Sequence, residues 1–245
     1  MQYAFGSGSL FAIPAGANPT PVQFGALQDV SVDFNYSVKE LRGQFQFPLM
    51  IARGAGKIDW KCKAAKLYGA AMNSLFFNGT NAVGLQNTVV DESGTVAGTT
   101  ITVANSATWL TDLGVRNGST GVTYQRVASG PVAGISYSVA AGVYTFAAGD
   151  VGVQMLISYI YTTAASGNKT TITNQLMGNQ TQFQMVLGET FAVAGVNKQL
   201  TLTLNACVAN KWTLASKLED FWIPEWDGEA FADQNNIVGY LALSE

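Results

Sequence analysis

The stretch "VSVDFNYSVKEL", residues 30–41, decides the fold class of this chain, because apolar and polar residues alternate along it. Apolar or aromatic side chains occupy the even positions from 30 to 38, and polar side chains occupy the odd positions. A period of two is typical of a β-strand with one buried face and one solvated face. The same alternation returns at residues 57–64, so we expect a second strand of this kind.

Between these strands lies "KELRGQFQFPLMIARGAGK", residues 39–57, which combines basic and aromatic side chains with Gly43, Pro48 and Gly54. Proline cannot donate a backbone hydrogen bond, so Pro48 argues against a central strand at that point. The segment is predicted to be the distal part of a long hairpin, an arm that projects. The candidate arm residues are Lys39, Glu40, Arg42, Phe45, Phe47, Arg53 and Lys57.

Residues 65–79, "AKLYGAAMNSLFFNG", change to a helical period. Leu67, Ala71 and Leu75 form one apolar stripe, and the pair Asn78 and Gly79 is a helix-ending combination. The sequence therefore predicts one short helix that covers a sheet or the mouth of a barrel.

The rest of the chain is also predicted to be β-rich, and its amino-acid composition changes in the middle. Residues 88–162 are rich in Thr, Val, Ala and Gly, which indicates a small β sub-domain inserted into a parent fold made of residues 1–87 and 163–245. The predicted fold class is all-β, a sandwich or barrel with one short helix. The alternation slips between Val208 and Trp212, which predicts a bulge there.

The composition favours a surface that is covered by a partner. Only 12% of the residues are charged and 48% are hydrophobic, whereas soluble domains usually have roughly 25% charged residues. The formal net charge of -3 argues against a protein that binds duplex DNA by neutralising many phosphates. The N-terminal residues lack the basic region of a signal peptide, so we expect a soluble protein made in a cytoplasm.

The charges are segregated along the chain. Seven of the 13 basic residues lie between positions 39 and 66, and six of the 16 acidic residues lie between 219 and 233. Such oppositely charged segments can pair within one subunit or between subunits. The candidate acidic and aromatic interface comprises Glu219, Asp220, Glu225, Trp226, Asp227 and Glu229.

The sequence offers little for catalysis. The chain has no histidine, which excludes Ser-His-Asp and Cys-His mechanisms and His-ligated zinc. "RGAGKI" departs twice from a phosphate-binding loop, because Ile51 stands in place of a glycine and Ile58 in place of Ser or Thr. We therefore expect no cofactor, no metal and no catalytic residue. Carboxylates among aromatic residues at 219–229 leave a carbohydrate-active enzyme as one alternative.

Two long runs resemble the tail tube proteins of bacteriophages. They are residues 24–77, "FGALQDVSVDFNYSVKELRGQFQFPLMIARGAGKIDWKCKAAKLYGAAMNSLFF", and residues 201–245, which begin "TLTLNACVANKWTLASKLEDFW". The shared pattern is a strand, an extended arm, a returning strand and a short helix, with closing strands at the C-terminus. Residues 88–162 have no counterpart in the minimal tube fold.

The resemblance implies a subunit that forms closed rings, commonly hexameric, which stack into a hollow tube for the passage of genome DNA. It implies a virion location, and other tail proteins as partners, such as a sheath, a tape measure, a terminator and a baseplate. The arm is expected to reach another copy and meet its acidic segment, while Phe45, Phe47 and Trp226 supply apolar contacts. The polar positions Asp29, Asp33 and Asn35 are candidates for the lumen lining, with an ordinary solvated sheet face as the alternative.

A different function class stays open on the sequence alone. The chain could be a virion decoration or adhesion protein, with residues 88–162 as a surface- or carbohydrate-binding β module.

Overall fold

The computed structural model describes residues 8–66, 69–193, 196–216, 218–219 and 221–244. The structure is nearly all β, with 62% strand and 6% helix, which confirms the predicted fold class. Two compact units make up the chain: unit 1 combines Met1–Asn81 with Thr170–Glu245, and unit 2 is Ala82–Lys169. Unit 2 is longer than the predicted insertion at both ends, because two long strands, β5 and β11, carry the chain into and out of it.

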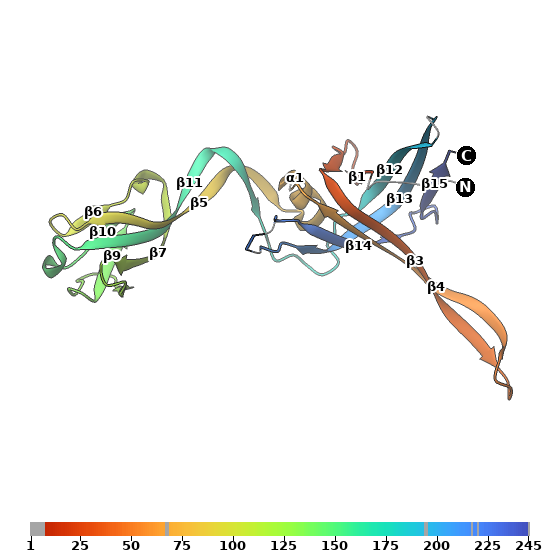
Figure 1. Ribbon diagram of the computed structural model, residues 1–245, viewed down its shortest axis with the longest axis horizontal. Coiled ribbons are helices and arrows are strands. Elements are labelled where there is room, and N and C mark those ends of the chain that lie inside the picture. The colour runs from red at the N-terminus through yellow and green to blue at the C-terminus, as the bar shows by residue number, and fades with distance from the viewer. Residues whose placement is uncertain (1–7, 67–68, 194–195, 217, 220, 245) are drawn as a thin grey trace. The chain divides into compact units, whose positions relative to one another are not determined.

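Unit 1 is built on one antiparallel sheet with the strand order β2-β1-β12-β13-β14-β4-β3 (Figure 1). An additional strand, β15, pairs with the N-terminal half of β13, on the same side as β14. The bounds are β1 Ser9–Pro14, β2 Val22–Phe24, β3 Leu27–Arg42, β4 Pro48–Ala64, β12 Phe183–Val193, β13 Val196–Thr213, β14 Glu225–Phe231 and β15 Gly239–Leu243.

The longest pairing in unit 1 is the hairpin of β3 and β4. It contains the two alternating runs predicted from sequence, and Pro48 is the first residue of β4, where no ladder bond is needed. The predicted slip in β13 is also confirmed, because the register with β14 shifts between Ala209 and Lys211. Local alternation therefore identified both the strands and their irregularity.

The core of unit 1 lies on one face of this sheet, the face that carries Trp60 and Cys62 of β4. Trp60 and Cys62 are 1% and 2% exposed. The indole of Trp60 packs edge-on against the Phe183 ring, with the ring centres 5.8 Å apart. The short helix covers this core: α1, Gly69–Met72, continues as a π-helical turn, Asn73–Phe77, in which Leu75 is buried.

The helix ends as the sequence predicted. Asn78 is left-handed, with φ 45°, and its backbone N–H donates to the Asn73 carbonyl. Leu67, part of the predicted apolar stripe, lies outside the described residues.

Unit 2 is a second β structure with its own core. Its strand order is β5-β11-β7-β8-β9-β10-β6, and β8 and β9 are parallel. The bounds are β5 Thr80–Thr95, β6 Thr100–Thr102, β7 Trp109–Asn117, β8 Thr123–Arg126, β9 Ser136–Ala140, β10 Val143–Thr145 and β11 Gln154–Thr171, with 3-10 turns at Ser106–Thr108 and Ala148–Asp150. Four tyrosines, Tyr124, Tyr137, Tyr144 and Tyr159, are buried in this core.

Candidate assembly interface

The outer half of the β3–β4 hairpin pairs with no other described strand. β14 pairs with β4 only from Ile58 to Lys63, so β3 and β4 continue beyond the sheet as a two-stranded ribbon (Figure 1). An isolated two-stranded ribbon is at best marginally stable in water. A ribbon of this kind is stabilised when a partner covers it.

This outer ribbon exposes an unusual amount of apolar surface. Phe45 and Phe47, in the turn, are 72% and 82% exposed. The other large apolar side chains that are exposed on the ribbon are Tyr36, Val38, Leu41, Leu49, Met50 and Ile51. So many large exposed apolar side chains on one short segment are typical of a protein–protein contact. We call residues 36–56 the assembly arm.

The charged residues of the assembly arm make local contacts within the arm. The Arg42 Nε donates to Glu40 Oε2 at 2.8 Å, and the Arg53 guanidinium lies 4.9 Å from the centre of the Tyr36 ring. The formal charge of the assembly arm is +2, from three basic residues, Lys39, Arg42 and Arg53, and one acidic residue, Glu40. The arm therefore offers both apolar and positively charged surface.

Trp226 is part of the core, so the prediction that it anchors an intersubunit contact is wrong. It is 2% exposed, and its ring packs edge-on against the Phe24 ring, with the ring centres 5.6 Å apart. The physical reason is the alternation of β14, which turns Trp226 and Gly228 inward and the acidic residues that alternate with them outward. The aromatic residues that this segment does expose are Phe221, at 90%, and Trp222, at 50%.

The acidic side chains of β14 meet lysines of the same chain. Lys57 Nζ lies 3.2 Å from Glu229 Oε1, and Lys63 Nζ lies 3.1 Å from Glu225 Oε1. Asp227 pairs with Lys211 of β13. The expected contact between this acidic segment and another subunit's Lys57 is thus replaced by pairing inside one chain, because β14 is the sheet neighbour of β4. Of the other acidic candidates, Glu219 is exposed, and Asp220 lies outside the described residues.

These ion pairs affect the lysines directly. The hydrogen bonds that Lys57 donates to Asp59 and Glu229 raise its pKa above the usual 10.5, and the hydrogen bond that Lys63 donates to Glu225 raises the pKa of Lys63. Both ammonium groups are solvent-exposed, so the pairs stabilise the sheet only modestly.

Asp29, Asp33 and Asn35 lie on one face of β3 and are exposed. Their neighbours in register are Lys63, Asp59 and Lys57 of β4. The full polar face of β3, β4, β14 and β13 carries six acids and four lysines, a formal charge of -2: Asp29, Asp33, Asp59, Glu225, Asp227, Glu229, Lys57, Lys61, Lys63 and Lys211.

The polar face has two hollows, of about 260 and 370 Å³, which contain Asp29 and Asp33 respectively. Among the described residues, no group of three or more His, Cys, Asp or Glu is placed to hold a metal ion. The carboxylates of Glu225, Asp227 and Glu229 each pair with a lysine. Together these contacts make the face a mixed-charge, solvated surface.

An apolar groove at the base of the assembly arm was not identified from the sequence. It consists of two adjoining cavities of about 310 and 140 Å³, and both are lined by Val238. The other apolar walls include Phe34 and Tyr36 of β3, Ile58 of β4, Leu202 and Leu204 of β13, Phe231 of β14, and Tyr240 and Leu241 of β15. We call it the base groove. No single stretch of the sequence reveals it, because five different strands contribute.

No described helix is long and apolar enough to cross a membrane. Comparison with models of known protein families found no match, and comparison with curated proteins found no similar sequence.

Proposed function

We propose that this chain is a structural virion protein that self-assembles into stacked rings, which form the hollow tail tube of a bacteriophage and conduct its DNA. The observation that carries the proposal is the assembly arm, whose aromatic and aliphatic side chains are exposed on a ribbon that pairs with no other described strand. Burying such surface between copies is favourable by about 25 cal/mol per Å².

Open strand edges support the formation of rings. In the sheet of unit 1, β2 and β3 end the strand order, and β3 is 16 residues long. Exposed edges of this length favour pairing with another chain. When the β3 edge of each copy meets the opposite edge of the next, the sheet continues from copy to copy and the ring closes without a free edge.

The base groove is a suitable acceptor for the arm of a second copy. The tip of the arm and the groove are both apolar, and they lie at opposite ends of the same hairpin, since Tyr36 lines the groove and Phe47 lies in the turn. A contact between the tip of one copy and the groove of the next leaves a free tip and a free groove, so it can repeat. Repeated contacts of this kind produce stacking.

The mixed-charge polar face of β3, β4, β14 and β13 fits a channel for DNA. Its formal charge of -2 and its lysines, two of which are held by Glu225 and Glu229, give a wall with little attraction for phosphates. Asp29, Asp33 and Asn35 would line the lumen. DNA then passes without being held. In this role the chain needs no cofactor and has no catalytic residue, and its partners are its own copies and other tail proteins.

The test replaces the two exposed aromatic residues of the arm. We expect Phe45→Asp with Phe47→Asp to leave a folded, unassembled protein, because neither ring is buried in the single chain. The matched control is Leu176→Asp with Met177→Asp, two side chains outside the arm that are 87% and 104% exposed.

Negative-stain microscopy and sedimentation measure assembly, and circular dichroism measures folding. Hollow rings or tubes from the wild-type and control proteins, with none from the arm variant, support the proposal. Compact wild-type monomers at high concentration, or normal tubes from the arm variant, contradict it.

A further inference from the structure

Unit 2 has a bulge in β7 at Leu113. The register between β11 and β7 passes from Ser158↔Gly114 to Tyr159↔Asp112, so Leu113 has no partner in β11. Gly114 has φ +119°, and a side chain added there would meet no atom within 4 Å, so this backbone faces open space. Bulges redirect side chains and occur often beside binding sites.

A second irregularity lies beside the bulge, on the other side of β11. Asp91 of β5 has φ 58°, in the left-handed region that non-glycine residues seldom adopt. Its backbone N–H donates to Ser158 Oγ at 3.1 Å, which places Asp91 at the level of the bulge. Strained backbone that is maintained by its surroundings is a reason to look for a function there.

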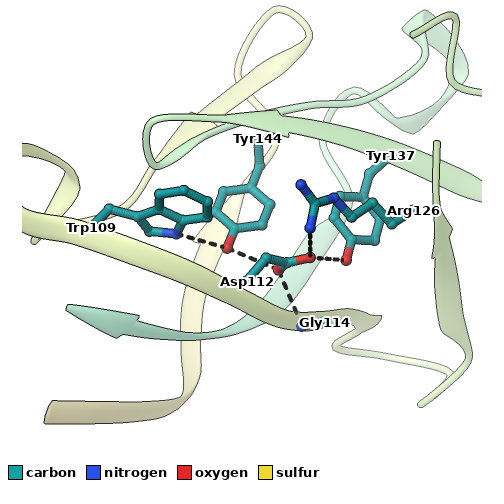
Figure 2. A network of polar contacts seen from close by, with 6 residues as sticks. All are labelled: Trp109, Asp112, Gly114, Arg126, Tyr137 and Tyr144. Carbon is teal, nitrogen blue, oxygen red and sulfur yellow. Dashed lines mark hydrogen bonds and ion pairs between the residues drawn. The ribbon is translucent and has the colours of Figure 1, made fainter. Parts of the chain in front are cut away.

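The bulge is held from the core side by the buried carboxylate of Asp112 (Figure 2). Asp112 Oδ1 accepts from the Gly114 N–H at 3.1 Å and from the Tyr144 hydroxyl at 3.0 Å, and Oδ2 accepts from the Tyr137 hydroxyl at 2.6 Å. The Asp112 side chain is only 4% exposed. The indole N–H of Trp109 also donates a hydrogen bond to the Tyr144 hydroxyl.

This network makes the bulge rigid. Burial, reinforced by Asp112, raises the pKa of the Tyr137 hydroxyl, so it remains a hydrogen-bond donor at neutral pH. A backbone feature supported by satisfied buried polar groups is preorganised, as functional sites require.

In front of the bulge is a hollow of about 140 Å³. The Arg116 guanidinium forms two hydrogen bonds with the Asp91 carboxylate, one of them from Nε to Oδ1 at 3.0 Å. The Ser158 and Thr123 side chains add hydroxyl groups, while Leu113 and Leu156 supply apolar wall. We call this the bulge pocket.

The chemistry of the bulge pocket selects for a neutral ligand. Asp91 and Arg116 cancel in charge, so an ionic ligand gains no net attraction there. They still present fixed acceptors and donors, and ligand sites typically combine a few such groups with apolar walls. A compound with several hydroxyls and apolar C–H surface satisfies both, and the volume suits one sugar ring.

We propose that the bulge pocket of unit 2 binds one ring of a neutral saccharide. Asp91 and Arg116 hydrogen-bond the sugar hydroxyls, and Leu113 and Leu156 contact its C–H surface. This activity is separate from tube formation, and it requires neither the assembly arm nor the base groove. A single ring in an open hollow is expected to bind with a Kd on the order of 1 mM.

The test is saturation-transfer NMR on the full-length protein with methyl α-glucoside, methyl α-galactoside, methyl α-mannoside and N-acetylglucosamine as probes. Arg116→Gln removes the charged donor, and Leu113→Ala removes apolar wall without touching the ion pair. The matched control is Leu110→Ala, because Leu110 is a similarly exposed leucine of β7 (45% against 50%) that is not among the pocket residues.

We expect transfer to at least one probe, with affinity about tenfold weaker in Arg116→Gln and Leu113→Ala and unchanged in Leu110→Ala. If the wild-type protein transfers saturation to none of the probes, the proposal is overturned. It is also overturned if both pocket variants bind the sugar as well as the wild type does, or if Leu110→Ala loses as much affinity as they do. If circular dichroism shows that Arg116→Gln is unfolded, Leu113→Ala decides the result, since its side chain is half exposed.

Discussion

The Lys57 ammonium is shared between two acids of its own chain, 3.2 Å from Glu229 Oε1 and 3.0 Å from Asp59 Oδ1. Glu229 and Asp59 face each other in register on β14 and β4, so without Lys57 two like charges would be neighbours. Lys57 therefore stabilises the junction between the sheet and the assembly arm. The residues left for contact with another copy are the apolar and basic ones farther out.

The Lys57 pairing should be visible in the pH dependence of stability. The folded-state pKa of Lys57 lies above 10.5, so its contribution is fully present below pH 10.5 and is lost as the pH rises through the folded value. We expect Lys57→Met to be less stable than the wild type at neutral pH, and the difference to shrink above about pH 10.5. Urea denaturation at a series of pH values measures this. A difference that is constant across pH would contradict the assignment.

The basic residues of the assembly arm provide a test that is separate from its aromatic residues. Arg42→Glu with Arg53→Glu changes the formal charge of the arm from +2 to -2, and we expect the variant to fold but not to assemble. Sedimentation velocity measures assembly. Lys66→Glu with Lys169→Glu moves the same charge at two exposed lysines outside the arm and should assemble normally. Normal assembly of the arm variant would show that its charge is irrelevant.

Trp226 and Trp222 are close in sequence but differ in role. Trp226 is 2% exposed, so Trp226→Ala should lower the free energy of unfolding by about 3 to 5 kcal/mol. Trp222 is 50% exposed, and Trp222→Ala should change it by less than about 1 kcal/mol.

Urea denaturation in the Phe45→Asp, Phe47→Asp background gives both values without a contribution from assembly. Equal effects of the two substitutions would mean that Trp226 is not part of the core.

Gly228 is required by close packing. A Cβ at this position would collide with the Trp60 ring and the Val208 carbonyl, so we expect Gly228→Ala to cost about 3 kcal/mol or more, or to prevent folding. Gly188 is the control, because a Cβ there meets no atom within 4 Å. Thermal unfolding of the two variants should separate them clearly. A Gly228→Ala protein as stable as Gly188→Ala would be inconsistent with this packing.

The two cysteines should be unreactive in the folded protein. Burial is the main cause that raises the pKa of Cys62 and of Cys207 to about 12, so at pH 8 about one thiol in ten thousand is ionised. Iodoacetamide followed by mass spectrometry should find both unmodified in the native state and both modified in urea. Rapid modification of either one in the native protein would place it at the surface.

Much of this architecture could be predicted from local sequence. The alternation at residues 30–38 identified β3, the alternation at residues 57–64 identified the inner part of β4, and the slip before Trp212 identified the bulge in β13. The same alternation placed Trp226 opposite its acidic neighbours, and applying it there would have assigned Trp226 to the core. The bounds of unit 2 could not be predicted as accurately from the sequence, because β5 and β11 extend beyond the point where the composition changes.

The sequence by itself determined which residues form strands, which side of each strand is polar, and where a long hairpin lies, since these depend on a period of two within one segment. Only the tertiary structure decided that β14 is the neighbour of β4, so that Glu229 meets Lys57 inside one chain. It likewise brought Val238 and Tyr36 into the base groove, and Asp91 to Arg116 in the bulge pocket. These contacts join residues far apart in sequence, and strand order and register, which create them, leave no periodic trace in a single segment.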